Sequence, residues 1–226
     1  MIFGPKIKTN LKTFDGLQIF IGNTNVMRVN STKFLGLIIQ SDLKWTAHID
    51  MVLNKLHKLI GVIYKAKNKL TCEIMLLLYF SFFYPYLIYV NIFWGDANKF
   101  LINKLRVTQN RYLRMCFSLN YLDSTKEVLR KNKLMTIEQI NQFVTVCFIY
   151  KVLYVDGYQF LNKIEKINHG RRQGTLVIDK SRTVLNDKSW SVRGLQLWNS
   201  LQMDVYKPTY IAFKKSLKEY ITTTVQ

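Results

Sequence analysis

The feature that most constrains the fold is a run of 21 residues without a charged side chain, from Ile74 to Trp94. A helix of this length could span a bilayer, so the run lies either in a membrane or in a protein core. Tyrosines occur throughout it, whereas the tyrosines of membrane helices gather at the two interfaces. Pro85 would also kink or break a helix near its centre. We therefore expect a buried helix interrupted near Tyr84 and Pro85, and a membrane protein built on residues 74–94 is the alternative. Five of its side chains are predicted to be mostly buried: Leu77, Phe80, Tyr84, Leu87 and Ile88.

The residues before this run are typical of short β-strands. Leu17 to Ile21 and Val26 to Val29 are β-type runs on either side of the turn residues Gly22 to Asn25, which predicts a hairpin. Phe34 to Ile39 is apolar around Gly36 and predicts a third antiparallel strand, in which the glycine marks a bend or a close approach of another backbone. Three strands are too few to be stable alone, so helices must cover them.

Helical periodicity dominates the rest of the chain. The clearest helix is Ile49 to Leu70, and a second runs from Asn98 to Phe117. Further helices are predicted from Ser124 to about Leu129, from Thr136 to about Tyr154 and from about Tyr210 to Ile221. The fold class is therefore α+β and helix-dominated, with a small N-terminal antiparallel hairpin or sheet. The core stripe of the first helix is predicted as Ile49, Val52, Leu53, Leu56, Leu59, Ile60 and Ile63.

Charge points to an acidic partner. The chain has 33 Lys and Arg against 14 Asp and Glu, a net charge of +19, which favours nucleic acid or an anionic membrane surface. No acidic residue occurs from Met51 to Cys72, although a solvated helix face normally mixes both signs. At 100° per residue, four lysines of this helix share an arc of roughly 80°. We expect this arc to face phosphates, with a plain solvated face as the alternative, and its members are Lys55, Lys58, Lys65 and Lys69.

The second helix is also basic, because residues 97–122 contain no acid. Its Lys104, Arg111 and Arg114 are candidates for phosphate contacts. Gln109 and Asn110 could hydrogen-bond bases or sugars, or could instead cross-link helices, and the sequence leaves both readings open.

A polar segment from Asn168 to Asn186 is the best candidate for a flexible loop. It contains glycines and the pair Arg171 and Arg172, which we expect to meet nucleic acid or solvent.

No motif for a metal, a cofactor or a catalytic nucleophile is recognisable. The three cysteines lie far apart and give neither zinc spacing nor a disulfide framework. No histidine has a Cys or a carboxylate at ligand spacing, and no phosphate-binding glycine-rich loop occurs. The 14 acidic residues are dispersed, and none are adjacent.

Four motifs, in order, resemble the C-terminal part of non-LTR (LINE-type, jockey-like) retrotransposon reverse transcriptases. Lys33 to Trp45, followed by His-Ile, resembles the end of the palm and the start of the thumb. Within residues 76–95 stands the pattern Leu-Tyr-x-Ser-x-Phe-x-Pro-x-Leu-x-Tyr-x-x-x-x-Trp-Gly. Residues 105–114 match Leu-x-x-x-Gln-Asn-x-x-Leu-Arg, and residues 189–201 match Ser-x-x-x-Arg-Gly-x-x-Leu-Trp-Asn-x-Leu.

The resemblance implies three regions. Residues 1–45 would be a palm remnant in which Phe34, Leu35 and Gly36 resemble the primer grip. Residues 46–118 would be a helical, thumb-like domain, and residues 119–226 a helical C-terminal region with a basic loop at about 168–188. Arg193 of the last motif completes the expected nucleic-acid contacts.

As to function, the resemblance implies a fragment of an RNA-directed DNA polymerase that binds RNA and RNA–DNA duplexes. The family's catalytic aspartates precede the point where this sequence begins, so we expect no DNA synthesis and no cofactor here, whereas the intact parent uses Mg²⁺. Its other partners would be the missing palm and fingers and the endonuclease, inside the cell in cytoplasm and nucleus. The alternative is a non-catalytic nucleic-acid-binding protein, a decayed or domesticated remnant.

Overall fold

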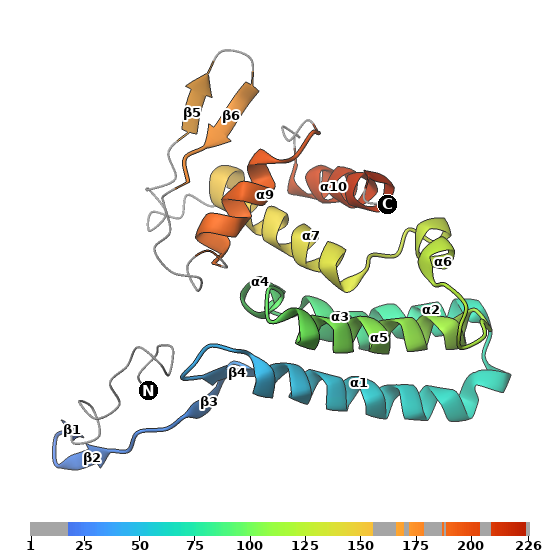
Figure 1. The fold of residues 1–226 in the computed structure, drawn as a ribbon, viewed down its shortest axis with the longest axis horizontal. Coiled ribbons are helices and arrows are strands. Elements are labelled where there is room, and N and C mark those ends of the chain that lie inside the picture. Colours follow the sequence, from blue (N-terminus) through green and yellow to red (C-terminus); the bar gives the residue numbers. More distant parts are fainter. Residues whose placement is uncertain are drawn as a thin grey trace.

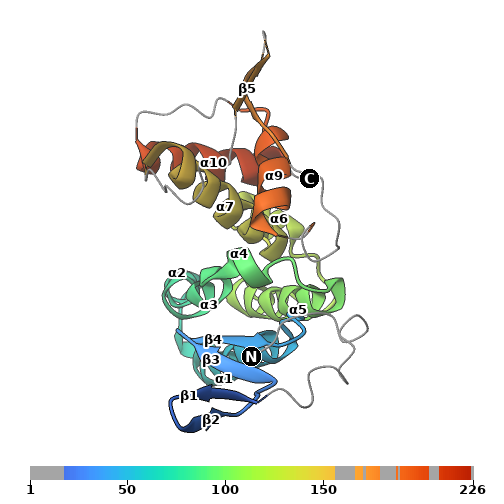
Figure 2. The same ribbon diagram turned by 90° about the vertical axis from the view of Figure 1, so that its left-hand side faces the viewer.

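A computed structural model describes residues 18–155, 166–169, 172–178, 187, 189–203 and 209–224. The fold is α+β and dominated by helices, as predicted, and three tiers of helices lie one above another (Figures 1 and 2). The lowest is α1 (Thr46–Ala66). The middle tier contains α2 (Cys72–Leu78), α3 (Tyr84–Ile88), α4 (Asn91–Trp94) and α5 (Lys99–Cys116). Through α6 (Lys126–Lys131) the chain reaches the upper tier of α7 (Ile137–Tyr150), α9 (Leu195–Asn199) and α10 (Tyr210–Thr224).

The N-terminal strands form two separate hairpins. β1 (Ile19–Ile21) pairs with β2 (Thr24–Val26) around Gly22 and Asn23, which confirms the predicted hairpin. Its turn is shorter than expected, so the second strand is Thr24–Val26 and not Val26 to Val29. β3 (Ser31–Phe34) pairs with β4 (Leu37–Gln40) in a two-stranded sheet of its own. The expected three-stranded arrangement is therefore wrong.

The reason is a turn inside the expected third strand. Phe34 lies opposite Leu37 in the hairpin, so Leu35 and Gly36 are the two residues of its turn. Their φ angles are 45° and 83°. Hairpin turns with positive φ at both central positions favour glycine, and Gly36 adopts this conformation at little steric cost. The glycine thus reverses the chain instead of bending one strand.

Helix α1 confirms the predicted core stripe. Six of its seven members are buried and Leu59 is half-buried. The helix begins and ends a few residues earlier than expected, because it runs from Thr46 to Ala66 and then passes into a 3₁₀ turn, η2 (Lys67–Lys69).

The uncharged run is interrupted where the sequence predicts. α2 passes into a π-helical segment, η3 (Tyr79–Phe83), and α3 follows. Pro85 has no N–H to donate to the carbonyl of Ser81, and its ring would crowd that carbonyl in a regular helix, so a wider turn precedes it. No helix in the described part of the chain is long and apolar enough to cross a membrane.

The buried face of this run differs from the prediction. The core side chains recur every fourth residue through the π-helical segment: Met75, Tyr79, Phe83 and Leu87. Of the five side chains expected in the core, Leu87 alone is fully buried. Leu77 is 64% exposed and Phe80 42% exposed, whereas Tyr84 and Ile88 are half-buried. The expected set was wrong because the buried positions follow this four-residue repeat from Met75, and Leu77 and Phe80 lie outside it.

Two clusters of buried side chains form the core, and α7 contributes to both. The first lies among α1, α2–α5 and the start of α7 at Ile137 and Ile140. The second joins the later part of α7 to Trp198 of α9 and Phe213 of α10. A capping box begins α7: the Gln139 N–H donates to Thr136 Oγ1, and the Thr136 N–H donates to Gln139 Oε1. After α7 the chain continues as a π-helical segment, η4 (Lys151–Val155).

The expected flexible loop contains a third hairpin. β5 (Lys166–His169) pairs with β6 (Arg172–Leu176), so this part of the polar segment is ordered as strands and the prediction of a loop is wrong there. Arg171 lies outside the described residues, as does the side chain of Arg172. A further π-helical segment, η6 (Trp190–Gly194), leads into α9.

Candidate nucleic-acid interface

The turn of the β3–β4 hairpin is attached to the helical body by side chains. Tyr89, just after α3, donates from its hydroxyl to the carbonyl of Leu35 at 2.5 Å. A Cβ added at Gly36 would lie 3.6 Å from the Tyr89 ring, so the ring packs directly on the turn. The backbone N–H of Ile38 donates to Nδ1 of His48 at 3.3 Å, which ties β4 to α1. The hairpin therefore holds a defined position on the helices.

These attachments present an apolar tip to solvent. Phe34 is 62% exposed and Leu35 is 75% exposed, although both lie next to fixed backbone. An exposed apolar pair on a braced turn can contact a partner without first being ordered, which removes one entropic cost of binding. This is the element that the sequence links to a primer grip.

His48 contacts the same hairpin directly, and Trp94 acts on it through Tyr89. The indole N–H of Trp94 donates to the carbonyl of Tyr89 at 2.9 Å, and its ring centroid is 5.7 Å from that of His48. Burial, and secondly the charge of Lys55, hold the pKa of His48 below its usual 6.5. The imidazole is therefore neutral near pH 7, and its bare Nδ1 accepts the hydrogen bond of Ile38. This histidine is structural.

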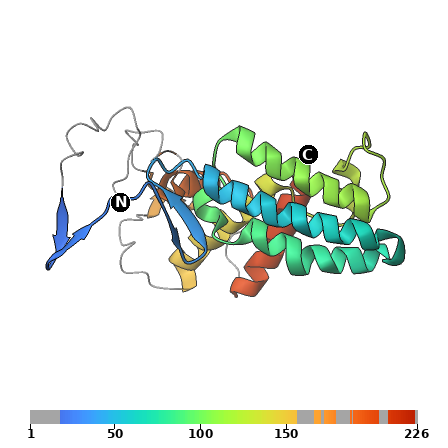
Figure 3. The ribbon, with the colours of Figure 1, turned by 90° about the horizontal axis from the view of Figure 1, so that it is seen from below.

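The four lysines predicted to share an arc are all exposed, on the outer side of α1 and its continuation. Figure 3 shows α1 (cyan) between α5 (green) and α2–α3 (teal). In the part of the chain that the structure describes, none of the four forms an ion pair. Lys55 lies over the ring of Tyr86, 5.1 Å from its centroid. Lys69 belongs to η2, so the arc continues past the end of α1 and is not carried by one helix.

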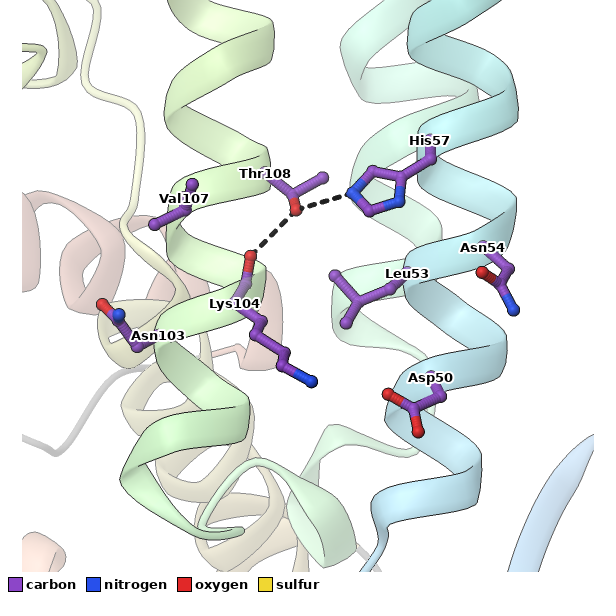
Figure 4. Close-up of a pocket in the computed structure, with 8 residues that line it drawn as sticks. All are labelled: Asp50, Leu53, Asn54, His57, Asn103, Lys104, Val107 and Thr108. Carbon is purple, nitrogen blue, oxygen red and sulfur yellow. Dashed lines mark hydrogen bonds between the residues drawn. The ribbon is translucent and has the colours of Figure 1, made fainter.

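A shallow groove of about 640 Å³ separates α1 from α5 (Figure 4). Thr108 Oγ1 donates to the carbonyl of Lys104 at 2.8 Å and accepts from Nε2 of His57 at 3.2 Å, which links the two walls. Two amides, one carboxylate, one ammonium and two apolar side chains line the rest, so the groove offers both donors and acceptors. Its lining residues are Asp50, Leu53, Asn54, His57, Asn103, Lys104, Val107 and Thr108.

On α5 the two amide residues serve the interior. Gln109 is 1% exposed, and its Nε2 donates to the hydroxyl of Tyr79 at 2.9 Å and to the carbonyl of Met135 at 2.8 Å. Asn110 accepts through Oδ1 from the hydroxyl of Thr125 at 3.0 Å. Of the two readings left open by the sequence, cross-linking of helices holds for both. The assignment of Gln109 to nucleic acid is therefore wrong, because its side-chain amide is enclosed by core atoms.

The three basic candidates of α5 differ in accessibility. Lys104 and Arg111 are exposed, and Lys104 borders the groove. Arg114 is half-buried, and its Nε donates to the carbonyl of Asp123 at 3.0 Å. Its guanidinium is thus partly committed to holding the loop that follows α5, which leaves Lys104 and Arg111 as the better placed pair.

The last sequence motif is a structural element. Arg193 forms an ion pair with Asp96, which follows α4, so its charge is already compensated. Asn199 makes two 2.9 Å hydrogen bonds with the backbone of Leu176, accepting from its N–H and donating to its carbonyl. Trp198 is buried in the second core cluster. Sequence reasoning assigned Arg193 to nucleic acid and missed its pairing, because Asp96 is 97 positions away.

The described residues contain no group of three or more His, Cys, Asp or Glu side chains placed to hold a metal ion. The surface around the hairpin and α1 combines three features suited to binding a partner. These are apolar contact at the tip, positive charge along α1 and both hydrogen-bond donors and acceptors in the groove.

Comparisons with known proteins identify no relative. No family model matches the chain, and neither the curated proteins nor the solved structures contain a significant match.

Proposed function

We propose that this chain binds template–primer nucleic acid as the C-terminal part of a non-LTR retrotransposon reverse transcriptase. The observation that carries the proposal is where the motif residues lie. Gly36 and His48 of the first motif meet Tyr89 and Trp94 of the second, and together they position the Phe34–Leu35 tip. Residues of two family-like motifs, 40 to 60 positions apart in the sequence, thus hold the same hairpin turn in place. This shared structural role supports the interpretation that both motifs derive from one family.

The lysines of α1 supply the second line of support. Lys55, Lys58, Lys65 and Lys69 are exposed and form no ion pair with the described carboxylates, so their field is not neutralised locally. A positive face of this kind contacts phosphates and is largely indifferent to base sequence. RNA–DNA duplexes are recognised mostly by backbone and shape, which suits such a surface. In this reading the protein acts inside the cell, in the cytoplasm and nucleus.

The test replaces all four lysines with glutamine and measures affinity for an RNA–DNA duplex at several salt concentrations. Each phosphate contact contributes a log–log slope of about −0.7 to −0.9, so the variant should bind more weakly and with a slope flatter by about two to four. Folding should be unaffected, because exposed lysines contribute little to stability.

A charge-matched control replaces four exposed lysines of α6 and α10 with glutamine: Lys126, Lys131, Lys214 and Lys215. Both variants lose four positive charges, so net charge alone would weaken binding equally. A larger loss in the α1 variant supports the proposal. An unchanged slope in a folded α1 variant, or equal losses in both variants, would refute the assignment of α1 as the interface.

The alternative, a nucleic-acid-binding remnant without a catalytic parent, makes the same binding prediction. The two differ in what is encoded in frame before Met1. A palm containing adjacent aspartates there supports the polymerase, whereas stop codons or unrelated sequence support the remnant. On either reading, the purified chain should not extend a primer on an RNA template. Mg²⁺-dependent nucleotide incorporation that a substitution within this chain abolishes would overturn that expectation.

A further inference from the structure

Two cysteines that are distant in the sequence meet between helices. Cys72 is the first residue of α2, and Cys116 is the last residue of α5, 44 positions later. Their Sγ atoms are 3.6 Å apart, and Cys116 Sγ also lies 3.6 Å from the carbonyl oxygen of Cys72. Both are free thiols. A disulfide needs about 2.05 Å between sulfurs, so a further approach of about 1.5 Å would suffice.

We propose that Cys72 and Cys116 form a redox-sensitive pair, which closes to an intramolecular disulfide when the protein meets a low-molecular-weight disulfide such as oxidised glutathione. This inference concerns a modification site and does not depend on the nucleic-acid function.

The order of events follows from access. Cys72 is exposed, whereas Cys116 is 3% exposed, so the oxidant reaches Cys72 first. The Cys72 thiolate attacks one glutathione sulfur and forms a mixed disulfide, and the other glutathione leaves as a thiolate. Cys116 then loses its proton and attacks the Cys72 sulfur, which releases the second glutathione. The two protein thiols give up two protons and two electrons, and oxidised glutathione takes up both as two molecules of reduced glutathione.

Burial favours Cys116 as the second thiol and not the first. Burial, together with its contact with Cys72, raises the pKa of Cys116 to about 12. A thiol with so little thiolate reacts slowly with a free oxidant, but it can attack a sulfur already held beside it. The third cysteine, Cys147, is buried in the second core cluster, and burial raises its pKa to about 12 as well. It is 5% exposed and belongs to another cluster, so it serves as an internal control.

The experiment treats the native, reduced protein with oxidised glutathione and counts thiols after denaturation in acid. The count should fall from three to one. Trypsin should then yield peptide 70–99 linked to peptide 115–126, as read by mass spectrometry without reductant. Cys147→Ser should give the same linked peptides with no thiol left, whereas Cys116→Ser should stop at glutathionylated Cys72.

Far-UV circular dichroism and urea unfolding then report whether the native fold accommodates the bond. The oxidised protein should keep its helical spectrum and unfold at a higher urea concentration than the reduced protein, a shift absent from Cys116→Ser. Stable glutathionylation of Cys72 without the linked peptides would overturn the proposal. So would links to Cys147, links between two chains, or a lower urea midpoint after oxidation, because each means that the native fold does not hold this pair ready.

Discussion

Replacing Gly95 with alanine should strongly destabilise the fold, because there is no room for a Cβ at this position. The added carbon would lie 2.1 Å from Nδ2 of Asn141, 2.2 Å from Oδ1 of Asn91 and 2.7 Å from the Asn91 carbonyl oxygen. Those atoms belong to a buried network that links α4 to α7. Asn141 Nδ2 donates to Asn91 Oδ1 at 2.9 Å, and Asn91 Nδ2 donates to the carbonyl of Leu87 at 2.8 Å.

The size of the effect follows from two costs. Forcing one extra carbon into a packed interior costs about 1–3 kcal/mol. Moving the Asn141 amide aside leaves buried polar atoms without partners, at about 1–3 kcal/mol for each group. We therefore expect Gly95→Ala to lower the free energy of unfolding by about 3–5 kcal/mol. Domains are commonly stable by only about 5–15 kcal/mol, so the variant should be close to unfolding at 37 °C.

Urea unfolding followed by circular dichroism measures the loss, and Gly61→Ala is the matched control. Gly61 is exposed within α1, and a Cβ there would meet nothing within 4 Å. Alanine is favoured over glycine in a helix by about 0.5–1 kcal/mol, so this control should gain stability. In the double variant Gly95→Ala and Asn141→Ala, the losses should be less than additive, because both disturb one network. A loss below about 1 kcal/mol in Gly95→Ala would refute the reasoning.

Three further predictions concern the hairpin attachments and the last motif. The pKa of His48 is lower in the folded than in the unfolded protein, so the unfolded state binds more protons below pH 6.5. Stability should therefore be retained above pH 6.5 and fall as the pH drops through the lowered value, and urea midpoints of His48→Gln should lose this pH dependence. Tyr89→Phe removes the hydroxyl bonded to Leu35 and should speed hydrogen exchange in the β3–β4 hairpin while α1 is unchanged; equal protection would contradict the attachment. Asn199→Asp cannot donate to the carbonyl of Leu176 and should cost about 1–3 kcal/mol, measured by thermal unfolding; no change would show that the contact is dispensable.

The sequence alone determined the elements that depend on near neighbours. Apolar residues at helical spacing located α1 and its core face, and Pro85 located the interruption of the uncharged run. Asn98 caps α5 by accepting from the N–H of Phe100, and Thr136 caps α7, both within three residues. Spacing, caps and proline act along a few residues of chain, so their signals are present in the sequence itself. The candidate surface was also predictable as far as it consists of the exposed lysines of α1, Lys55, Lys58 and Lys65.

Tertiary structure decided every feature whose partner is far along the chain. Nothing in the sequence around Gln109 distinguishes an amide on the surface from one that hydrogen-bonds Tyr79 and Met135 in the core. The local sequence likewise does not predict the pairing of Arg193 with Asp96 or the approach of Cys72 to Cys116. In each case two segments meet because helices pack against one another. Whether a polar side chain stays free or finds a hydrogen-bond partner then depends on the residues that this packing places beside it.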